Sequence, residues 1–219
     1  MRLEAADEHE FDVYSAATAL PAKAAVVIVQ EIFGVNSHIR SVVDDYASEG
    51  FLAIAPALFD RVERNFQLGY GPEDRKKAIQ AATQVGLDAA LKDLQAAIRQ
   101  AAEKCESKKV GVIGFCWGGT LAWLAATRLQ PAAAVGYYGG QISKFAAEKP
   151  TCPVMLHFGE KDAHIPMSEI DTIRRHHPDL PVFLYDAGHG FNCNQRESYE
   201  PRSAALARQR TLEFLRQQL

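Results

Sequence analysis

Short, uninterrupted apolar runs alternate along the chain with segments in which apolar residues recur at helical spacing. Strands that are apolar on both faces are typical of parallel sheets, in which crossover helices cover the two faces. We interpret six runs as strands of this kind, at residues 24–29, 51–55, 110–113, 132–138, 153–158 and 181–185. A weaker alternation at residues 11–14 indicates an additional edge strand. The pattern therefore predicts an α/β fold with a mostly parallel central sheet and helices on both faces.

Helical patterns occupy the intervals between these runs. Asn36 or Ser37 is a candidate N-cap for a helix that Gly50 ends, and Pro72 followed by two acids marks the start of another. Helices are further expected at residues 87–102, 121–127, 170–177 and from about residue 198 onward. Residues 59–74 are polar and irregular, and their pattern leaves open whether they form a lid.

The composition changes this picture little, but it narrows the range of partners. The chain has 219 residues, of which 47% are hydrophobic and 23% charged, as in ordinary globular domains. No repeat or linker interrupts it, so we expect residues 1–219 to form one compact domain without a large cap. A net charge of −3 does not favour nucleic acid or an anionic membrane as partner. No apolar run approaches the roughly 18 residues of a membrane span, and a monomer is the expected state.

The spacing of the four cysteines argues against a metal site or a disulfide framework. Cys105, Cys116, Cys152 and Cys193 form no C-x-x-C pair, so neither is predicted. Free thiols, together with an N-terminus that has no signal-peptide pattern, favour a cytoplasmic location. We interpret all of them except Cys116 as structural residues.

Residues 114–120, Gly-Phe-Cys-Trp-Gly-Gly-Thr, stand between a predicted strand and a predicted helix. A strand, a sharp turn with a nucleophile type at its tip and then a helix form the arrangement called a nucleophile elbow. The residues two positions on either side of the tip approach the strand and the helix closely, and Gly114 and Gly118 remove the bulk there. The residue at the tip is Cys116, a candidate nucleophile, for which a packed and inert thiol is the alternative.

Polar groups follow the ends of four predicted strands. They are residues 30–33, Cys116, the stretch that ends in Asp162, and the stretch around His189. Because an open α/β sheet binds ligands at the carboxyl ends of its strands, we expect these groups to meet. Cys116, Asp162 and His189 also follow one another in the order nucleophile, acid, base that an α/β-hydrolase uses. A helix cap and a turn residue are the respective alternatives for Asp162 and His189, and His164 is interpreted as a loop residue rather than a rival base.

With these motifs, the chain resembles the dienelactone hydrolase family, the carboxymethylenebutenolidases of the α/β-hydrolase superfamily. The resemblance extends from about residue 20 to the C-terminus. The matching stretches are residues 30–36 (Gln-Glu-Ile-Phe-Gly-Val-Asn), 114–119, 135–139 (Val-Gly-Tyr-Tyr-Gly), 159–162 (Gly-Glu-Lys-Asp) and 187–191 (Ala-Gly-His-Gly-Phe). It implies that a triad of Cys116, His189 and Asp162 hydrolyses a small, planar, carboxylate-bearing enol-lactone, with no metal or organic cofactor.

The resemblance also implies roles outside the triad. Glu31 corresponds to a buried glutamate beside the thiol, and Arg75 to an arginine that holds the substrate carboxylate. A surface carboxylate and a solvated arginine are the respective alternatives. Phe33 and Tyr138, which lie in two of the matching stretches, are further candidates for substrate binding.

General chemistry supports the same roles. A thiolate is favoured at a helix N-terminus beside a protonated histidine, and His189 would take or share the thiol proton and later return one to the leaving group. Asp162 would fix the imidazole tautomer and favour its charged form. The backbone N–H groups of Trp117 and Ile32 would meet the oxyanion. Glu31 cannot donate when ionised, so it is expected to accept a proton or to pair with an arginine.

Two positions depart from the family pattern. Family members with a defined dienelactone substrate have a second arginine where this chain has Cys193, and Arg196 lies three residues further. Ile79 stands where an aromatic partner is expected. A small-ester carboxylesterase or thioesterase with neutral substrates is therefore an alternative function. A hydrolase fold kept as a non-catalytic binding protein is a third, against which the complete triad argues.

Overall fold

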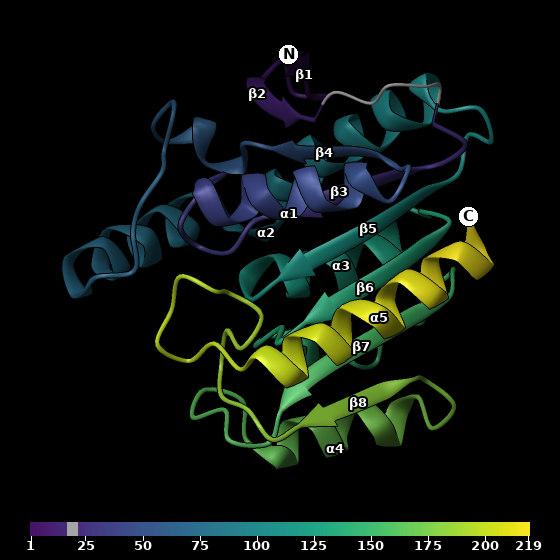
Figure 1. Cartoon of the computed structure of the whole chain (residues 1–219). Helices are drawn as coiled ribbons and strands as arrows, with labels where there is room; N and C mark the ends of the chain where they lie inside the picture. Colours follow the sequence, from purple (N-terminus) through teal and green to yellow (C-terminus); the bar gives the residue numbers. More distant parts are fainter. Residues whose placement is uncertain (17–21) are drawn as a thin grey trace.

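The computed structural model describes residues 1–16 and 22–219, and within them the chain forms a central sheet with helices on both sides (Figure 1). The sheet has eight described strands in the order β1-β2-β4-β3-β5-β6-β7-β8. β2 pairs antiparallel with both β1 and β4, and every other neighbouring pair is parallel. The strands are β1 (Arg2–Glu4), β2 (Glu10–Ser15), β3 (Ala25–Val29), β4 (Leu52–Pro56), β5 (Val110–Phe115), β6 (Ala133–Tyr137), β7 (Val154–Gly159) and β8 (Val182–Tyr185).

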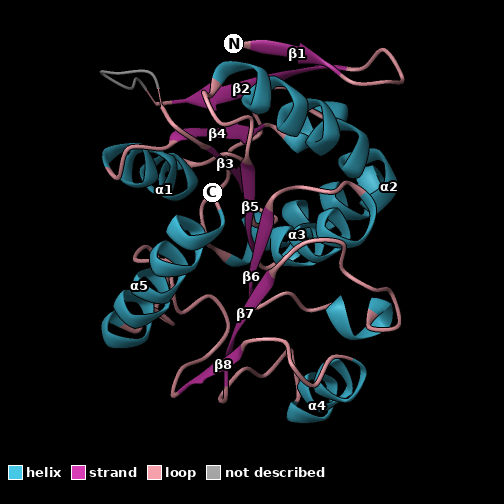
Figure 2. Cartoon of the chain, turned by 90° about the vertical axis from the view of Figure 1, so that its right-hand side faces the viewer, coloured by secondary structure: helices cyan, strands magenta, loops and turns pink. Residues whose placement is uncertain are grey.

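Five α-helices in the described part of the chain cover the sheet. They are α1 (Ser37–Ser48), α2 (Pro72–Lys104), α3 (Trp117–Arg128), α4 (Met167–His176) and α5 (Pro201–Gln218). α1 and α5 lie on one face of the sheet, and α2, α3 and α4 lie on the other (Figure 2). The expected three-layer α/β architecture is confirmed. The side chain of Asn36, rather than that of Ser37, caps α1 by accepting a hydrogen bond from the Ile39 backbone N–H.

All six apolar runs form parallel strands, whereas the prediction for residues 11–14 was wrong in one respect. These residues belong to β2, which lies between β1 and β4 and is therefore not the edge of the sheet. The edge strand is β1, which has three residues and buries none of them fully. A strand this short and exposed leaves no apolar alternation in the sequence, so the pattern could not reveal it.

The middle of the sheet positions the loops that carry the candidate site. Every residue of β3 and β5 is buried, and the register pairs Val29 with Gly114. Because β3 and β5 to β8 are parallel, their carboxyl ends lie at one edge of the sheet (Figure 1). The loops that follow these strands therefore meet at that edge, which is where open α/β sheets bind their ligands.

The irregular segment after β4 packs into the body of the protein. Its first turn is a short 3₁₀ helix, η1 (Leu58–Arg61), and both Phe59 and Phe66 are buried. The ring of Phe59 lies 5.2 Å from the ring of Trp117 at the start of α3. The aromatic contacts make this segment part of the wall beside the predicted elbow.

α2 consists of two helical parts that meet at a break. Gly86 has φ 69° and ψ 172°, a conformation that interrupts the helix and that glycine adopts without a Cβ clash. This break agrees with the two separate helical patterns in the sequence. The part after Gly86 buries Ala90, Leu94 and Ala97 against the sheet, whereas most residues from 72 to 80 are exposed.

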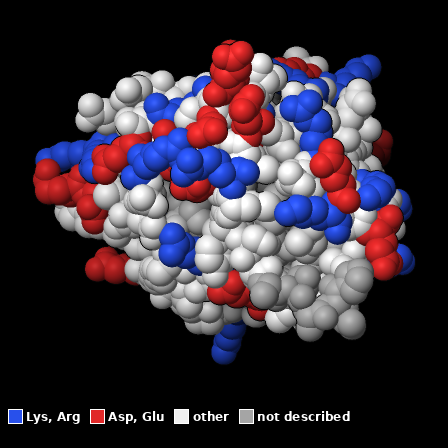
Figure 3. Space-filling view, turned by 90° about the horizontal axis from the view of Figure 1, so that it is seen from above, with Lys and Arg blue, Asp and Glu red and all other residues white. Residues whose placement is uncertain are grey.

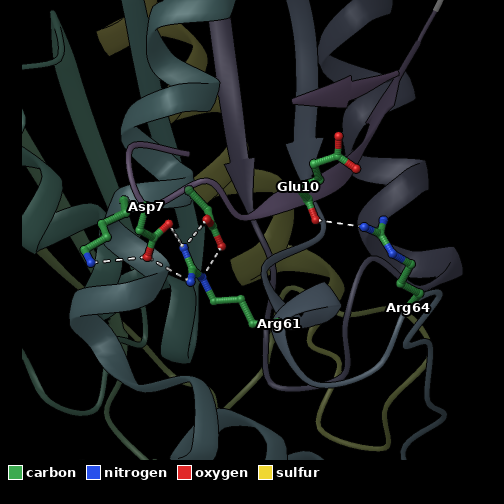
Figure 4. A network of polar contacts seen from close by, with 6 residues as sticks. Asp7, Glu10, Arg61 and Arg64 are labelled. Atoms are coloured by element: carbon green, nitrogen blue, oxygen red, sulfur yellow. Dashed lines mark hydrogen bonds and ion pairs between the residues drawn. The ribbon is translucent and has the colours of Figure 1, made fainter. Parts of the chain in front are cut away.

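An ion-pair cluster fixes the second part of α2. The Arg61 guanidinium donates to both carboxylate oxygens of Asp93, at 2.8 and 2.6 Å, and to Asp7 at 2.9 and 3.1 Å (Figure 4). The Asp93 side chain is fully buried, and burial raises the pKa of its carboxyl group although Arg61 opposes this shift. Nearby, Arg64 donates to the backbone oxygen of Glu10. The cluster therefore joins η1, α2 and the N-terminal hairpin.

The surface carries charges of both signs side by side. On the face seen in Figure 3, basic and acidic side chains are interleaved. Arg2, for example, lies 3.3 Å from Asp12 and 3.6 Å from Glu10. No helix among the described residues has the length and hydrophobicity needed to span a membrane.

Replacing Arg61 by alanine should lower the free energy of unfolding by about 3 kcal/mol, because the buried Asp93 carboxylate would lose its partner. Asp7→Asn removes only the more exposed side of the same cluster and should cost less than about 1 kcal/mol. Chemical denaturation of the two variants and the wild type measures the difference. Equal losses would show that Asp93 is not the anchoring partner.

Candidate active site

The turn that carries Cys116 is strained and closely packed. Cys116 has φ 55° and ψ −115° between the end of β5 and the start of α3. A Cβ atom on Gly114 would overlap the Gly118 carbonyl, and one on Gly118 would overlap the Val29 carbonyl. Both glycines are therefore needed for α3 to approach the strands. The turn holds the thiol at the carboxyl edge of the sheet, in the geometry of a nucleophile elbow.

The structure brings the three predicted triad residues into one hydrogen-bonded line. His189 Nε2 lies 3.1 Å from Cys116 Sγ, and His189 Nδ1 lies 2.7 Å from Asp162 Oδ2. The second carboxylate oxygen of Asp162 accepts a hydrogen bond of 2.8 Å from the backbone N–H of His164. The Asp162 side chain is fully buried, whereas that of His189 is 12% exposed. This line can transfer a proton between the thiol and the imidazole while the carboxylate fixes the ring.

The charges within this line stabilise one another. Burial of His189 opposes protonation, but the negative charge of Cys116 and the hydrogen bond to Asp162 outweigh it and raise the pKa of the imidazole to about 10. Burial would raise the pKa of Asp162, and the hydrogen bond from His189 overrides it, so the net shift is downward. The arrangement therefore favours a protonated imidazole beside an ionised carboxylate.

The two residues predicted to supply the oxyanion donors lie in neighbouring elements, at the start of α3 and after β3. Trp117 is the first residue of α3, so its backbone N–H belongs to the group that has no partner within the helix. Ile32 lies in the loop after β3, and both residues line the cavity that contains Cys116. The positive end of α3 points toward the same region.

Glu31 is buried beside the triad and pairs with an arginine. Its carboxylate Oε1 lies 3.2 Å from Arg196 Nη1, and its side chain is 1% exposed. The other oxygen, Oε2, has no hydrogen-bond partner among the described residues. The Arg196 guanidinium also lies over the rings of Phe33 and Tyr70, at 5.9 and 5.7 Å from their centroids. Of the two expectations for Glu31, the structure shows the ion pair with an arginine.

Tyr138 lies behind the imidazole and does not line the cavity. It is fully buried with φ 39°, and its ring centroid is 5.1 Å from that of His189. The ring centroid of Phe191 lies 5.4 Å from that of Tyr138. This position supports the His189 ring and does not reach the space where a ligand fits.

A cavity of about 550 Å³ opens above Cys116 and His189. Apolar side chains of α2, α3 and the loop after β3 form most of its wall. The lining residues include Ile32, Phe33, Arg75, Ile79, Ala82, Leu87, Trp117, His164 and Arg196. The predicted residues Arg75 and Phe33 therefore face the same space as Cys116 and His189.

Two residues of this wall, Arg196 and His164, were not predicted from the sequence to line the site. Arg196 reaches the cavity from the loop after β8. In the family pattern, the second arginine stands three residues earlier, at the position of Cys193. His164 lies 3.1 Å from Arg75 and 5.3 Å, ring to ring, from His189. A second basic residue in the last loop and a histidine two positions after the acid were the available signals.

The other cysteines occupy different environments from Cys116. Cys193 is buried, and burial together with the nearby charge of Glu31 raises the pKa of its thiol to about 11. Burial raises the pKa of the Cys152 thiol to about 11 as well. Such thiols stay protonated near neutrality and react slowly. Among the described residues, no three His, Cys, Asp or Glu side chains are arranged to hold a metal ion.

The sheet order, the elbow and the clustered loops define an α/β-hydrolase. An esterase from Pyrococcus furiosus shares this fold, with a TM-score of 0.72 at 14% identity over 100% of this chain and 91% of that chain. A solved structure from Klebsiella pneumoniae superposes with a TM-score of 0.83 at 29% identity, covering 96% and 95% of the two chains.

Sequence comparison narrows this class to one family. The profile of the dienelactone hydrolase family matches residues 11–219. The carboxymethylenebutenolidase of Pseudomonas putida is 34% identical over 223 residues, which cover 97% of this chain and 94% of that protein. A relative from Synechocystis is 36% identical over 211 residues, covering 89% and 86%. The chain belongs to the dienelactone hydrolase family, and it is a hydrolytic enzyme of that kind.

The imidazole of His189 should retain its proton far above pH 6.5, with a midpoint near 10. Because the folded-state pKa is raised, the ring stays charged as the pH increases and loses its proton only at the upper end of this range. Asp162→Asn and Cys116→Ala should each move the midpoint to lower pH, since each removes a negative partner. NMR titration of the ring signals measures these midpoints, and a wild-type midpoint near 6.5 would contradict the ion pair.

Proposed function

We propose that the protein opens a small, carboxylate-bearing enol-lactone of the dienelactone type through nucleophilic attack by Cys116. One observation carries the proposal. The Cys116 thiol is 3.1 Å from His189 Nε2 at the tip of a strained elbow, and it faces a cavity whose wall includes Arg75 and Arg196. This arrangement supplies a nucleophile, an acid–base group and positive charge for an anionic substrate.

Acylation begins with the thiolate. Cys116 Sγ attacks the lactone carbonyl carbon, a C–S bond forms, and the carbonyl π electrons move onto oxygen. The N–H groups of Trp117 and Ile32 stabilise this oxyanion. When the intermediate collapses, the ring C–O bond breaks and the leaving oxygen takes the Nε2 proton of His189. In a lactone that oxygen stays attached to the acyl group, so the product of this step is a ring-opened thioester.

Deacylation reverses the roles of acid and base. The now neutral His189 accepts a proton from water, and the water oxygen attacks the thioester carbonyl. The tetrahedral intermediate expels Cys116 as a thiolate and releases the carboxylic acid. The protonated His189 and the thiolate are then restored as a pair. Asp162 keeps the ring oriented through both halves of the reaction, with Tyr138 packed behind it.

The substrate carboxylate is held at the cationic side of the cavity. Arg75 projects there from the exposed first part of α2, and Arg196 projects from the loop after β8. An arginine fork matches a carboxylate geometrically, which favours it over a simple point charge. Phe33 contributes an aromatic surface beneath the Arg196 guanidinium. Arg196 thus brings a second guanidinium to the cavity wall, although its charge is paired with that of Glu31.

A carboxylesterase or thioesterase for small neutral esters is the second candidate, and the apolar lining of the cavity favours it. Ile79 and Ala82 follow Arg75 along α2 and leave an apolar wall. At 1.5 Å per residue, the path from Arg75 to Ala82 covers about 10 Å of helix. An aromatic residue at position 79 would shorten this space, so the departure from the family pattern extends the cavity.

The chemistry requires neither a cofactor nor a second subunit. Cys116, His189 and Asp162 supply the nucleophile, the acid–base group and its orienting partner from one chain. A monomer acting on a small dissolved ester or lactone is consistent with this arrangement. Free thiols such as Cys116 persist in a reducing compartment, which favours the cytoplasm as the place of action.

Cys116→Ala should reduce turnover of an activated ester by at least about 1000-fold, because no other group at the elbow can form the acyl intermediate. Cys116→Ser should also be much weaker than the wild type, since an alcohol is far less ionised beside the same imidazole. Steady-state kinetics on one ester compares the three proteins, with Cys152→Ala as the matched control expected to keep full activity. Retention of most activity in Cys116→Ala would refute the mechanism.

Arg75→Ala should raise KM for an anionic lactone about tenfold or more, because it removes a charged hydrogen-bond donor from the carboxylate site. The KM for a neutral ester should change less than about threefold. Lys76→Ala, which removes the adjacent exposed charge, is the matched control and should affect neither substrate. If Arg75→Ala changes both substrates equally, carboxylate recognition by Arg75 is wrong and the neutral-ester function is favoured.

A further inference from the structure

His164 lies between the triad and Arg75. Its Nε2 atom is 3.1 Å from Arg75 Nη2, and its ring stands at 82° to the His189 ring, with centroids 5.3 Å apart. Its backbone N–H donates to Asp162 Oδ1 at 2.8 Å. The turn that fixes the triad carboxylate therefore also directs the His164 side chain into the cavity, toward the arginine.

The contact with Arg75 determines which form of His164 is present. A guanidinium only donates hydrogen bonds, so His164 Nε2 must accept, and the ring must be neutral with its proton on Nδ1. Burial lowers the pKa of His164, and the positive charges of His189, Arg75 and Arg196 lower it further against the pull of Asp162. The surroundings and the hydrogen bond therefore favour the same neutral tautomer.

A neutral hydrogen-bond acceptor and a carboxylate differ in how much of the positive charge of an arginine they leave available to a substrate. Among the described residues, no carboxylate lies within ion-pair distance of Arg75, and His164 is the side chain that hydrogen-bonds its guanidinium. Arg196, in contrast, pairs with the Glu31 carboxylate. An imidazole can hold a guanidinium in one orientation without cancelling its charge, whereas a carboxylate holds it and neutralises it.

We propose that His164 is a positioning residue that holds the Arg75 guanidinium in the cavity as an uncompensated positive charge for the substrate anion. The inference rests on the proposed recognition of a carboxylate by Arg75. It assigns the selectivity for anionic substrates to a pair of residues, in which one provides the charge and the other fixes its direction. His164 does not itself touch the reacting atoms.

A set of three variants tests the pair. In His164→Gln, the amide oxygen can take the place of Nε2 as a neutral acceptor, so the selectivity for anionic over neutral esters should stay within about threefold of the wild type. His164→Glu introduces a side chain of nearly the same shape as that in His164→Gln, but with a negative charge. It should lower the selectivity for anionic over neutral esters about tenfold or more. His164→Ala frees the arginine and should lower it as well. The measured quantity is the ratio of kcat/KM for an anionic lactone to that for a neutral ester.

The ratio separates the possible outcomes. Effects of the substitutions on His189 change both substrates alike and cancel in the ratio. If Arg75→Ala abolishes the selectivity but His164→Glu and His164→Ala retain it, the inference fails and the proposed function stands. If Gln and Glu at position 164 behave alike, the charge argument is wrong. If the wild type shows no preference for the anionic lactone, the proposed substrate class fails and the inference fails with it.

A spectroscopic measurement tests the tautomer without any substrate. The ring ¹⁵N signals of His164, assigned by their loss in His164→Gln, should show a protonated Nδ1 and an unprotonated Nε2 at neutral pH. Removal of Arg75 should shift the Nε2 signal, because its hydrogen bond is lost. A doubly protonated His164 ring in the wild type at neutral pH would overturn the inference.

Discussion

The close contact between the end of β5, the start of α3 and the end of β3 is the constraint on which the site depends. Gly114 and Gly118 lie where any side chain would strike a backbone carbonyl, so the strands and the helix meet at a separation that only glycine permits. The strain of the turn is concentrated at Cys116, whose φ is 55°. The packing of the fully buried strands β3 and β5 offsets this conformational strain and holds the turn in place.

Around this turn, charges that burial would normally penalise are arranged in pairs with different purposes. His189 is placed between the thiol and Asp162, so its positive charge is stabilised from two sides. Glu31 and Arg196 neutralise each other at the back of the cavity. Arg75 is oriented by a neutral imidazole instead. The cavity therefore combines an internally balanced reaction centre with a positive charge on its outer wall.

The sequence predicted the strands that are apolar on both faces, the helices between them and the loops that would meet, because each has a local periodic or turn signal. It could not place β1, whose three residues carry no pattern, and it put the edge of the sheet at β2. The roles of Arg196 and His164 were harder to predict from the sequence, for another reason. Their importance depends on how the loop after β7 meets α2 and how the loop after β8 meets the loop after β3, and these arrangements have no signature in the spacing of residues along the chain.

The break at Gly86 has an evolutionary consequence. It separates the part of α2 that faces the cavity, which carries Arg75, from the part that Asp93 anchors in the core. Substitutions before Gly86 alter the shape and charge of the cavity while the buried contacts after it keep the fold stable. Because Arg75 and Ile79 on this wall are exposed, single mutations at these positions can change the substrate preference with the elbow and the triad left intact.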